Sequence, residues 1–148
     1  MKIIEIKMMS SKANQIIQTL NQIPAKNNSV VVYDIDGTLI DFSGNGIIPI
    51  IKTYQYAKTR GFIPVIVTAR PGTYENIVHT RNQLSAYFID DYKYMYFLPP
   101  ESSSRAQDQA DYKLTARKNL HEMGYTVVMS VGDMPWDIGA YGGVGIKL

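Results

Sequence analysis

The chain has 148 residues, 45% hydrophobic and 19% charged, which is the composition of an ordinary globular protein long enough to bury a core. Its formal net charge of +2 comes from Lys and Arg residues scattered along the chain, so binding to nucleic acid is possible but not indicated by charge. The absence of cysteine excludes disulfides, thiolate metal sites and a cysteine nucleophile.

The N-terminal segment lacks both the long apolar stretch and the small-residue cleavage site of a secretory signal. No window is long and apolar enough to span a bilayer, so we expect an intracellular, cytoplasmic protein with no membrane partner. The first expected element is an amphipathic helix, with Ser10 or Ser11 as N-cap and Pro24 closing the pattern. Its apolar positions favour packing on the core, with partner binding as the alternative; they are Ala13, Ile16, Ile17, Leu20 and Ile23.

From Val30 onward, expected strands alternate with expected helices. The strands are 30–34, 62–68, 92–98, 125–130 and 144–148, and the helices are 47–60, 74–87 and 108–123. The segment 99–104, rich in Pro and Ser, predicts a loop. This alternation predicts an α/β fold, a three-layer Rossmann-like sandwich with a mainly parallel sheet of about five strands and helices on both faces. We expect a single domain, residues 1–148, with 1–28 as an N-terminal extension and 29–148 as the catalytic core.

The strand expected at 30–34 ends in two carboxylates, Asp34 and Asp36, followed by Gly37 and Thr38. Ligands of open α/β sheets bind at the carboxyl ends of the strands. Two close carboxylates repel each other unless a cation, hydrogen bonds or a proton relieves them, and oxygen ligands favour Mg²⁺. Taken alone, the pair is equally compatible with ordinary turn residues.

Further polar groups follow at places that the alternating pattern brings to the same edge. After the second strand, Thr68 offers a hydroxyl and Arg70 a guanidinium for phosphate oxygens. Lys113, at the start of the third long helix, can reach the same crevice, and Asp133 and Asp137 follow the fourth strand. A carboxylate nucleophile, a second carboxylate, an acidic metal site and cationic groups together predict phosphoryl transfer through an aspartyl-phosphate.

The order of these motifs, from Val30 to the end of the chain, resembles that of the haloacid dehalogenase (HAD) superfamily. The resemblance implies that Asp34 is the nucleophile. It implies that Asp36 is the general acid and base, and a metal ligand through its backbone carbonyl. Thr68 would supply the phosphate-binding hydroxyl, with Ala69 and Arg70 beside it in the substrate site.

The same resemblance assigns the remaining motifs. Lys113 would stabilise both the nucleophile and the phosphoryl group. Asp133 would be the acidic Mg²⁺ ligand, and Asp137 would occupy the supporting position that binds or orients the waters of the metal. The segments 68–71, 112–113 and 132–139 look most like the class B and plant acid phosphatase branch of the superfamily.

Members of this superfamily usually gain selectivity from cap inserts, for which this chain has little room. The segment 41–48 can form only a small flap, so we expect an open crevice, which a neighbouring subunit of a homo-oligomer could cover. The leading hypothesis is a magnesium-dependent phosphomonoester hydrolase acting on a phosphorylated small molecule or on an exposed phosphate of a macromolecule. The alternatives are a polynucleotide end phosphatase and a non-catalytic phosphate- or partner-binding module.

Overall fold

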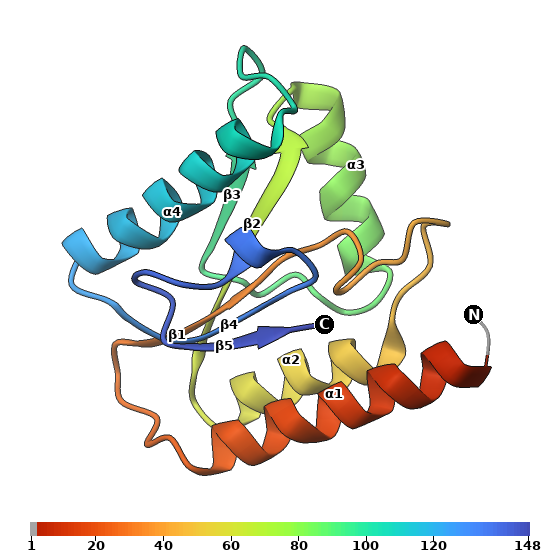
Figure 1. The fold of residues 1–148 in the computed structure, drawn as a ribbon, viewed down its shortest axis with the longest axis vertical. Helices are drawn as coiled ribbons and strands as arrows, with labels where there is room; N and C mark the ends of the chain where they lie inside the picture. The colour runs from red at the N-terminus through yellow and green to blue at the C-terminus, as the bar shows by residue number, and fades with distance from the viewer. Residues whose placement is uncertain (1–2) are drawn as a thin grey trace.

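The computed structural model describes residues 3–148, which form a parallel sheet flanked by helices (Figure 1). Along the sheet the strand order is β3-β2-β1-β4-β5. The strands are β1 (Ser29–Tyr33), β2 (Ile63–Pro71), β3 (Tyr94–Leu98), β4 (Thr126–Gly132) and β5 (Val144–Lys147). The helices are α1 (Ile3–Asn21), α2 (Ile48–Thr59), α3 (Tyr74–Ser85), α4 (Ala106–Glu122) and the short 3-10 helix η1 (Pro135–Asp137).

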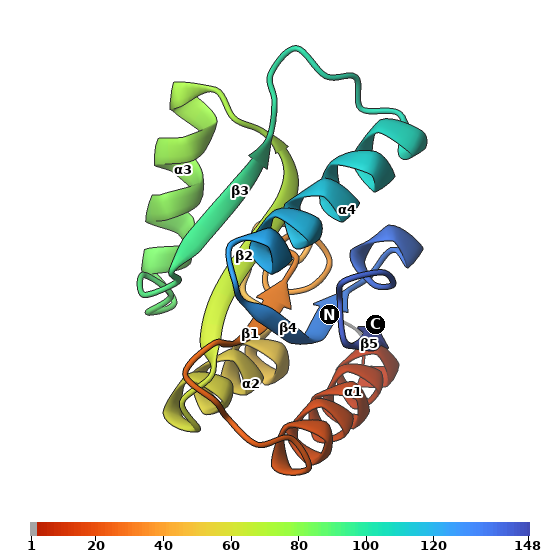
Figure 2. The ribbon, with the colours of Figure 1, turned by 90° about the vertical axis from the view of Figure 1, so that its left-hand side faces the viewer.

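Helices cover both faces of the sheet, as the sequence predicts. Because side chains alternate along a strand, β1 sends Val31 and Tyr33 into one core and Val30 and Val32 into the other. The first core also receives buried side chains from α1, α2 and α3, whereas the second is closed by α4. Figure 2 shows α4 on one side of the sheet, with α1 and α2 side by side on the other. The α/β Rossmann-like architecture is therefore confirmed.

The order of the strands places a crevice between β1 and β4. From β1 the chain passes through α2 to β2 and through α3 to β3, moving toward one edge of the sheet. It then returns through α4, on the opposite face, to β4 on the other side of β1. Right-handed crossovers require this change of face when the direction reverses. The carboxyl ends of β1 and β4 therefore lie at the switch point where open α/β sheets bind their ligands.

Three expected boundaries were wrong. Helix α1 spans Ile3–Asn21, so Ser10 and Ser11 lie inside it and neither is an N-cap. The first turns of this helix are exposed, so their apolar residues do not follow the helical spacing from which the helix was predicted. Strand β2 continues past Thr68, because Pro71 pairs with Leu98 of β3 after a register shift, where a missing N–H is tolerated. Lys113 does not open α4 but lies about two turns inside it.

Helix α1 shares its core with the sheet through Ile16 and Leu20, both fully buried. The assignment of 1–28 as an extension and 29–148 as the catalytic core stays a prediction. Across residues 3–148, no helix combines the length and the apolar composition needed to cross a membrane.

Replacing Leu20 by Ala should lower the free energy of unfolding by about 2–5 kcal/mol, since the change leaves a cavity beneath α1. The matched control is Met8→Ala on the same helix, where the side chain is 60% exposed and the effect should stay within about 0.5 kcal/mol. Urea unfolding followed by circular dichroism measures both. Equal stabilities of the two variants would contradict the packing of α1 on the core.

Candidate active site

The turn after β1 fixes the position of Asp34. Backbone N–H groups of residues 38–40 all bond to the carbonyl of Ile35, which folds the chain back on itself. The turn brings Thr38 Oγ1 to 3.2 Å from Asp34 Oδ2, to which it donates. On the other side, the backbone N–H of Asp34 donates to Val131 O of β4 over 3.0 Å. Asp34 is thus held from both strands and is only 7% exposed.

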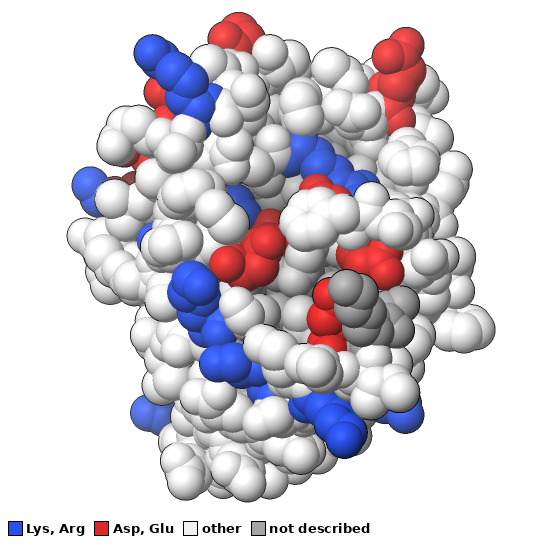
Figure 3. All heavy atoms as spheres, turned by 45° about the vertical axis from the view of Figure 1, so that its right-hand side comes forward, with Lys and Arg blue, Asp and Glu red and all other residues white. Residues whose placement is uncertain are grey.

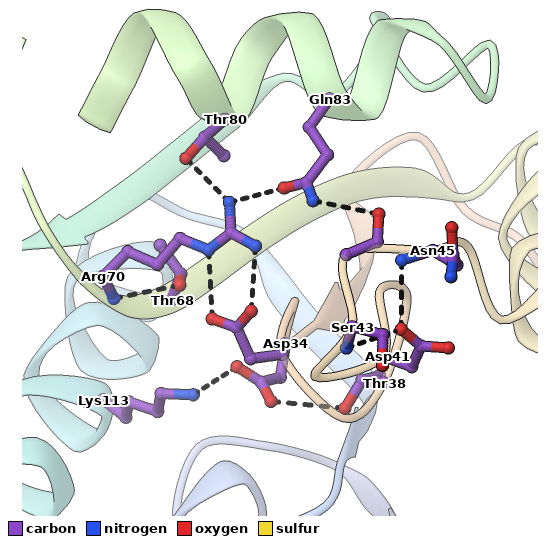
Figure 4. Close-up of polar contacts among 12 residues, drawn as sticks. Asp34, Thr38, Asp41, Ser43, Asn45, Thr68, Arg70, Thr80, Gln83 and Lys113 are labelled. Atoms are coloured by element: carbon purple, nitrogen blue, oxygen red, sulfur yellow. Dashed lines mark hydrogen bonds and ion pairs between the residues drawn. The ribbon is translucent and has the colours of Figure 1, made fainter. Parts of the chain in front are cut away.

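Lys113 of α4 places one ammonium group between two buried carboxylates. Its Nζ donates to Asp34 Oδ1 over 2.7 Å and also to Asp137 Oδ1. Burial alone would lower the pKa of Lys113, but the charges of Asp34 and Asp137 outweigh it, and the pKa is raised. Lys113 therefore stays protonated and stabilises the ionised carboxylates. Figure 4 shows its side chain reaching Asp34 opposite Thr38.

Three carboxylates converge at the switch point. Asp34, Asp133 and Asp137 each offer an oxygen within 4.8 Å of the others. Glycine makes this approach possible, because a Cβ at Gly37 would collide with the carboxylate of Asp133, and one at Gly132 with the side chain of Asp137. Gly37 also has a positive φ of 77°. The two glycines of the motifs therefore serve to bring the acidic groups together.

This cluster carries more negative charge than Lys113 can balance. Burial, together with the nearby charge of Asp137, raises the pKa of Asp34 to about 8, although Lys113 opposes the shift. Burial also raises the pKa of Asp133. A divalent cation among these oxygens would relieve the repulsion and favour the ionised form of Asp34. The donor set, all carboxylate oxygen, suits a hard divalent metal ion.

Asp36 lies outside this cluster and pairs instead with Arg70. The pair is bidentate, with Arg70 Nε 3.0 Å from Asp36 Oδ2 and Arg70 Nη2 2.8 Å from Asp36 Oδ1. Thr68 lies beneath Arg70, 1% exposed, and its hydroxyl accepts the backbone N–H of Arg70 over 3.1 Å. The guanidinium of Arg70 is therefore engaged by Asp36, whereas the hydroxyl of Thr68 accepts here and keeps its own O–H to donate. The phosphate-binding roles of both residues stay predictions.

A cleft of about 490 Å³ opens above these groups. Figure 3 shows acidic side chains gathered around a hollow on this face, with Lys and Arg beside them. The cleft has a charged floor and a rim with three large apolar side chains, Phe42, Met134 and Trp136. The other lining residues are Asp34, Asp36, Ala69, Arg70, Ser104, Ala106, Gln109, Lys113 and Asp133.

Most of the expected site residues therefore meet in one place. Asp137 lies buried behind the cleft, where its second oxygen accepts the N–H of Met134 over 3.0 Å. Thr68 is buried and does not line the cleft. Sequence reasoning missed Thr38, whose hydroxyl contacts Asp34.

Sequence reasoning also missed Arg117, a buried residue one turn after Lys113 on α4. Its guanidinium donates to three backbone carbonyls of the loop around Asp137: Trp136 over 2.9 Å, Ala140 over 3.0 Å and Ile138 over 3.4 Å. Burial lowers its pKa, an effect that Asp137 opposes. The available signal was its i, i+4 spacing from Lys113, which puts both cations on one face of the expected helix. Arg117 holds the acidic loop in place.

A family model described as HAD superfamily, subfamily IIIB (acid phosphatase), matches residues 44–146, more than half of the chain. The chain belongs to this family. It is therefore a phosphatase, acting on phosphorylated substrates, and the family implies a divalent metal ion, for which the acidic cluster is suited. The match contains Arg70, Lys113 and Asp133 but begins after Asp34 and Asp36, whose placement comes from the geometry. No curated protein matched the sequence.

Neutralising Asp34 should change how the stability of this HAD phosphatase depends on pH. Folding raises the pKa of Asp34 from 3.8 to about 8, so the folded state binds this proton more tightly than the unfolded chain. Its contribution to stability is then present below about pH 4 and is lost as the pH rises toward 8. Asp34→Asn should flatten this decline, measured by urea unfolding in EDTA at several pH values. The exposed Asp90→Asn should keep the slope of the native chain.

Loss of the Arg117 clamp should weaken metal binding. Arg117→Met removes the three donors to the loop of Asp137, and we expect the dissociation constant for a divalent cation to rise about 10- to 100-fold. Titration calorimetry measures this, and thermal unfolding shows whether the variant is folded. Lys118→Met, the exposed neighbour on α4, is the matched control. A folded Arg117→Met protein with unchanged affinity would contradict the clamp.

Proposed function

We propose that this protein is a magnesium-dependent phosphomonoester hydrolase that acts through a phosphorylated Asp34. The observation that carries the proposal is the pair formed by the buried Asp34 carboxylate and the Lys113 ammonium at the floor of the cleft. A carboxylate held and charge-stabilised beneath an open cleft is suited to nucleophilic attack. We further propose that the activity resides in one domain spanning residues 1–148.

The proposed first step transfers the phosphoryl group to Asp34. An Asp34 oxygen forms a bond to phosphorus, the bond between phosphorus and the leaving oxygen breaks, and that oxygen takes a proton from Asp36. Lys113, one of the residues lining the cleft, balances the charge of the nucleophile and of the phosphoryl oxygens. Ala69 and Arg70 line the same cleft, beside the place proposed here for the phosphoryl group.

The second step regenerates the enzyme. Water attacks phosphorus, gives a proton to Asp36, and the bond between phosphorus and Asp34 breaks to release inorganic phosphate. Asp36 is therefore acid first and base second. Its carboxylate borders the same cleft as Asp34, and the pair with Arg70 fixes its orientation there.

Mg²⁺ is proposed as the metal ion because the available ligands are all oxygen. Asp34 and Asp133 would hold it, with Asp137 and the backbone carbonyl of Asp36 in support. Bound there, it supplies positive charge that offsets the repulsion between Asp34 and a phosphate.

Asp34→Asn should abolish Mg²⁺-dependent release of 4-nitrophenol from 4-nitrophenyl phosphate, by about 10³-fold or more, because the amide is not a nucleophile. The intact chain should carry one phosphoryl group on Asp34 in mass spectra of the quenched reaction. The exposed Asp90→Asn controls for the loss of a carboxylate elsewhere. Turnover by Asp34→Asn at a rate near that of the native chain would overturn the proposal.

A further inference from the structure

Arg70 is held at both ends of its guanidinium. Toward the cleft it forms the bidentate pair with Asp36. On the other side, its Nη1 donates to Thr80 Oγ1 over 3.0 Å and to Gln83 Oε1 over 2.8 Å, both on α3 (Figure 4). Four of the five N–H groups of the guanidinium are therefore engaged. Arg70 is built as a rigid support for Asp36.

Gln83 continues this chain of hydrogen bonds to the loop that follows the turn at residues 35–40. Its Nε2 donates to Gly44 O over 3.3 Å. The loop, residues 41–47, is compact, because Asp41 Oδ1 accepts the backbone N–H of Ser43 over 2.9 Å and that of Asn45 over 3.0 Å. The same loop carries Phe42, 82% exposed, to the rim of the cleft.

We propose that Gln83 is a positioning residue for the Asp36 carboxylate, linking the 41–47 loop to it through Arg70. This inference rests on the proposed function, since it assigns to Asp36 the transfer of a proton to the leaving oxygen. A substrate that contacts the rim at Phe42 meets a loop whose position is tied, through Gly44, Gln83 and Arg70, to that of the acid. The position of the 41–47 loop and the position of the Asp36 carboxylate are thereby coupled.

The amide of Gln83 has the chemistry that this link requires. It accepts from Arg70 with its oxygen and donates to Gly44 with its nitrogen, which a carboxylate cannot do. Gln83→Glu keeps the acceptor for Arg70 and loses the donor to the loop. Gln83→Met is similar in length and loses both. Thr80 provides the second acceptor for Arg70, so Thr80→Val weakens the same support at nearly constant shape.

The dependence of rate on the leaving group tests this role. A 4-nitrophenolate leaves without a proton, whereas a simple alkoxide needs one, so a misplaced Asp36 penalises the alkyl ester most. Gln83→Met should lower kcat/KM for glycerol 1-phosphate about tenfold more than for 4-nitrophenyl phosphate, a part of the 10²- to 10⁴-fold that general acids contribute. Thr80→Val should shift the ratio in the same direction. Gln83→Glu loses only the donor to the loop, so it should shift the ratio in the same direction but less than Gln83→Met.

The matched control is Gln55→Met, the same substitution at an exposed position of α2. Thermal unfolding of each variant verifies that it is folded. Equal losses for the two esters in Gln83→Met, or kinetics identical to those of Gln55→Met, would overturn the positioning role and leave the proposed function intact. A native chain without phosphatase activity that depends on Asp34 would instead overturn the proposed function, and this inference with it.

Discussion

The burial of three carboxylates around one ammonium group is the constraint on which this structure depends. Asp34, Asp133 and Asp137 converge at the switch point of the sheet, and Lys113 touches two of them. Such a cluster costs folding free energy, because buried like charges repel each other, and the surrounding chain must therefore hold it together. The turn at 35–40, the two close-packed glycines and the clamp from α4 all serve to hold this arrangement.

Helix α4 connects the fold to the chemistry. It is the element that returns across the sheet from β3 to β4, and its inner face carries both buried cations. Lys113 contacts the Asp34 carboxylate that follows β1, and Arg117 contacts the loop that follows β4. Their i, i+4 spacing puts them on one face, so a single rigid element sets the distance between the two halves of the site. The helix that reverses the direction of strand addition is therefore also the helix that assembles the site.

Much of the fold could be predicted because its strands are buried on both faces. Runs such as Val30–Val32 and Val65–Val67 are apolar at every position and are therefore recognisable as buried strands. Because helices alternate with these strands along the chain, the strands pair in parallel. The start of α1 was missed, since Ile3 and Ile4 are apolar yet 72% exposed. The end of β2 was missed because the pairing of Pro71 with Leu98 depends on a neighbouring strand.

The candidate site divides in the same way. Asp34, Asp133 and Lys113 act through their own charges, so residue type and order along the chain were enough to single them out. Arg117 and Gln83 donate to backbone carbonyls of loops. Any residue type supplies a carbonyl, so these partners can be identified only in the folded chain. For Arg70 the residue could be singled out but not its partner, because the choice between Asp36 and a phosphate depends on Thr80 and Gln83 of α3.

The loop at 99–105 also borders the cleft, but unlike the loop at 41–47 it forms, within residues 3–148, no hydrogen-bonded link to Arg70 and Asp36. Its polar contacts are local: Ser102 N–H bonds to Pro99 O, and Gln109 on α4 donates to Ser104 O. Ser104 nevertheless stands at the cleft. This loop can therefore accept inserted residues, even a small folded module, without moving a catalytic group. It is the natural place to graft new substrate selectivity onto this minimal scaffold.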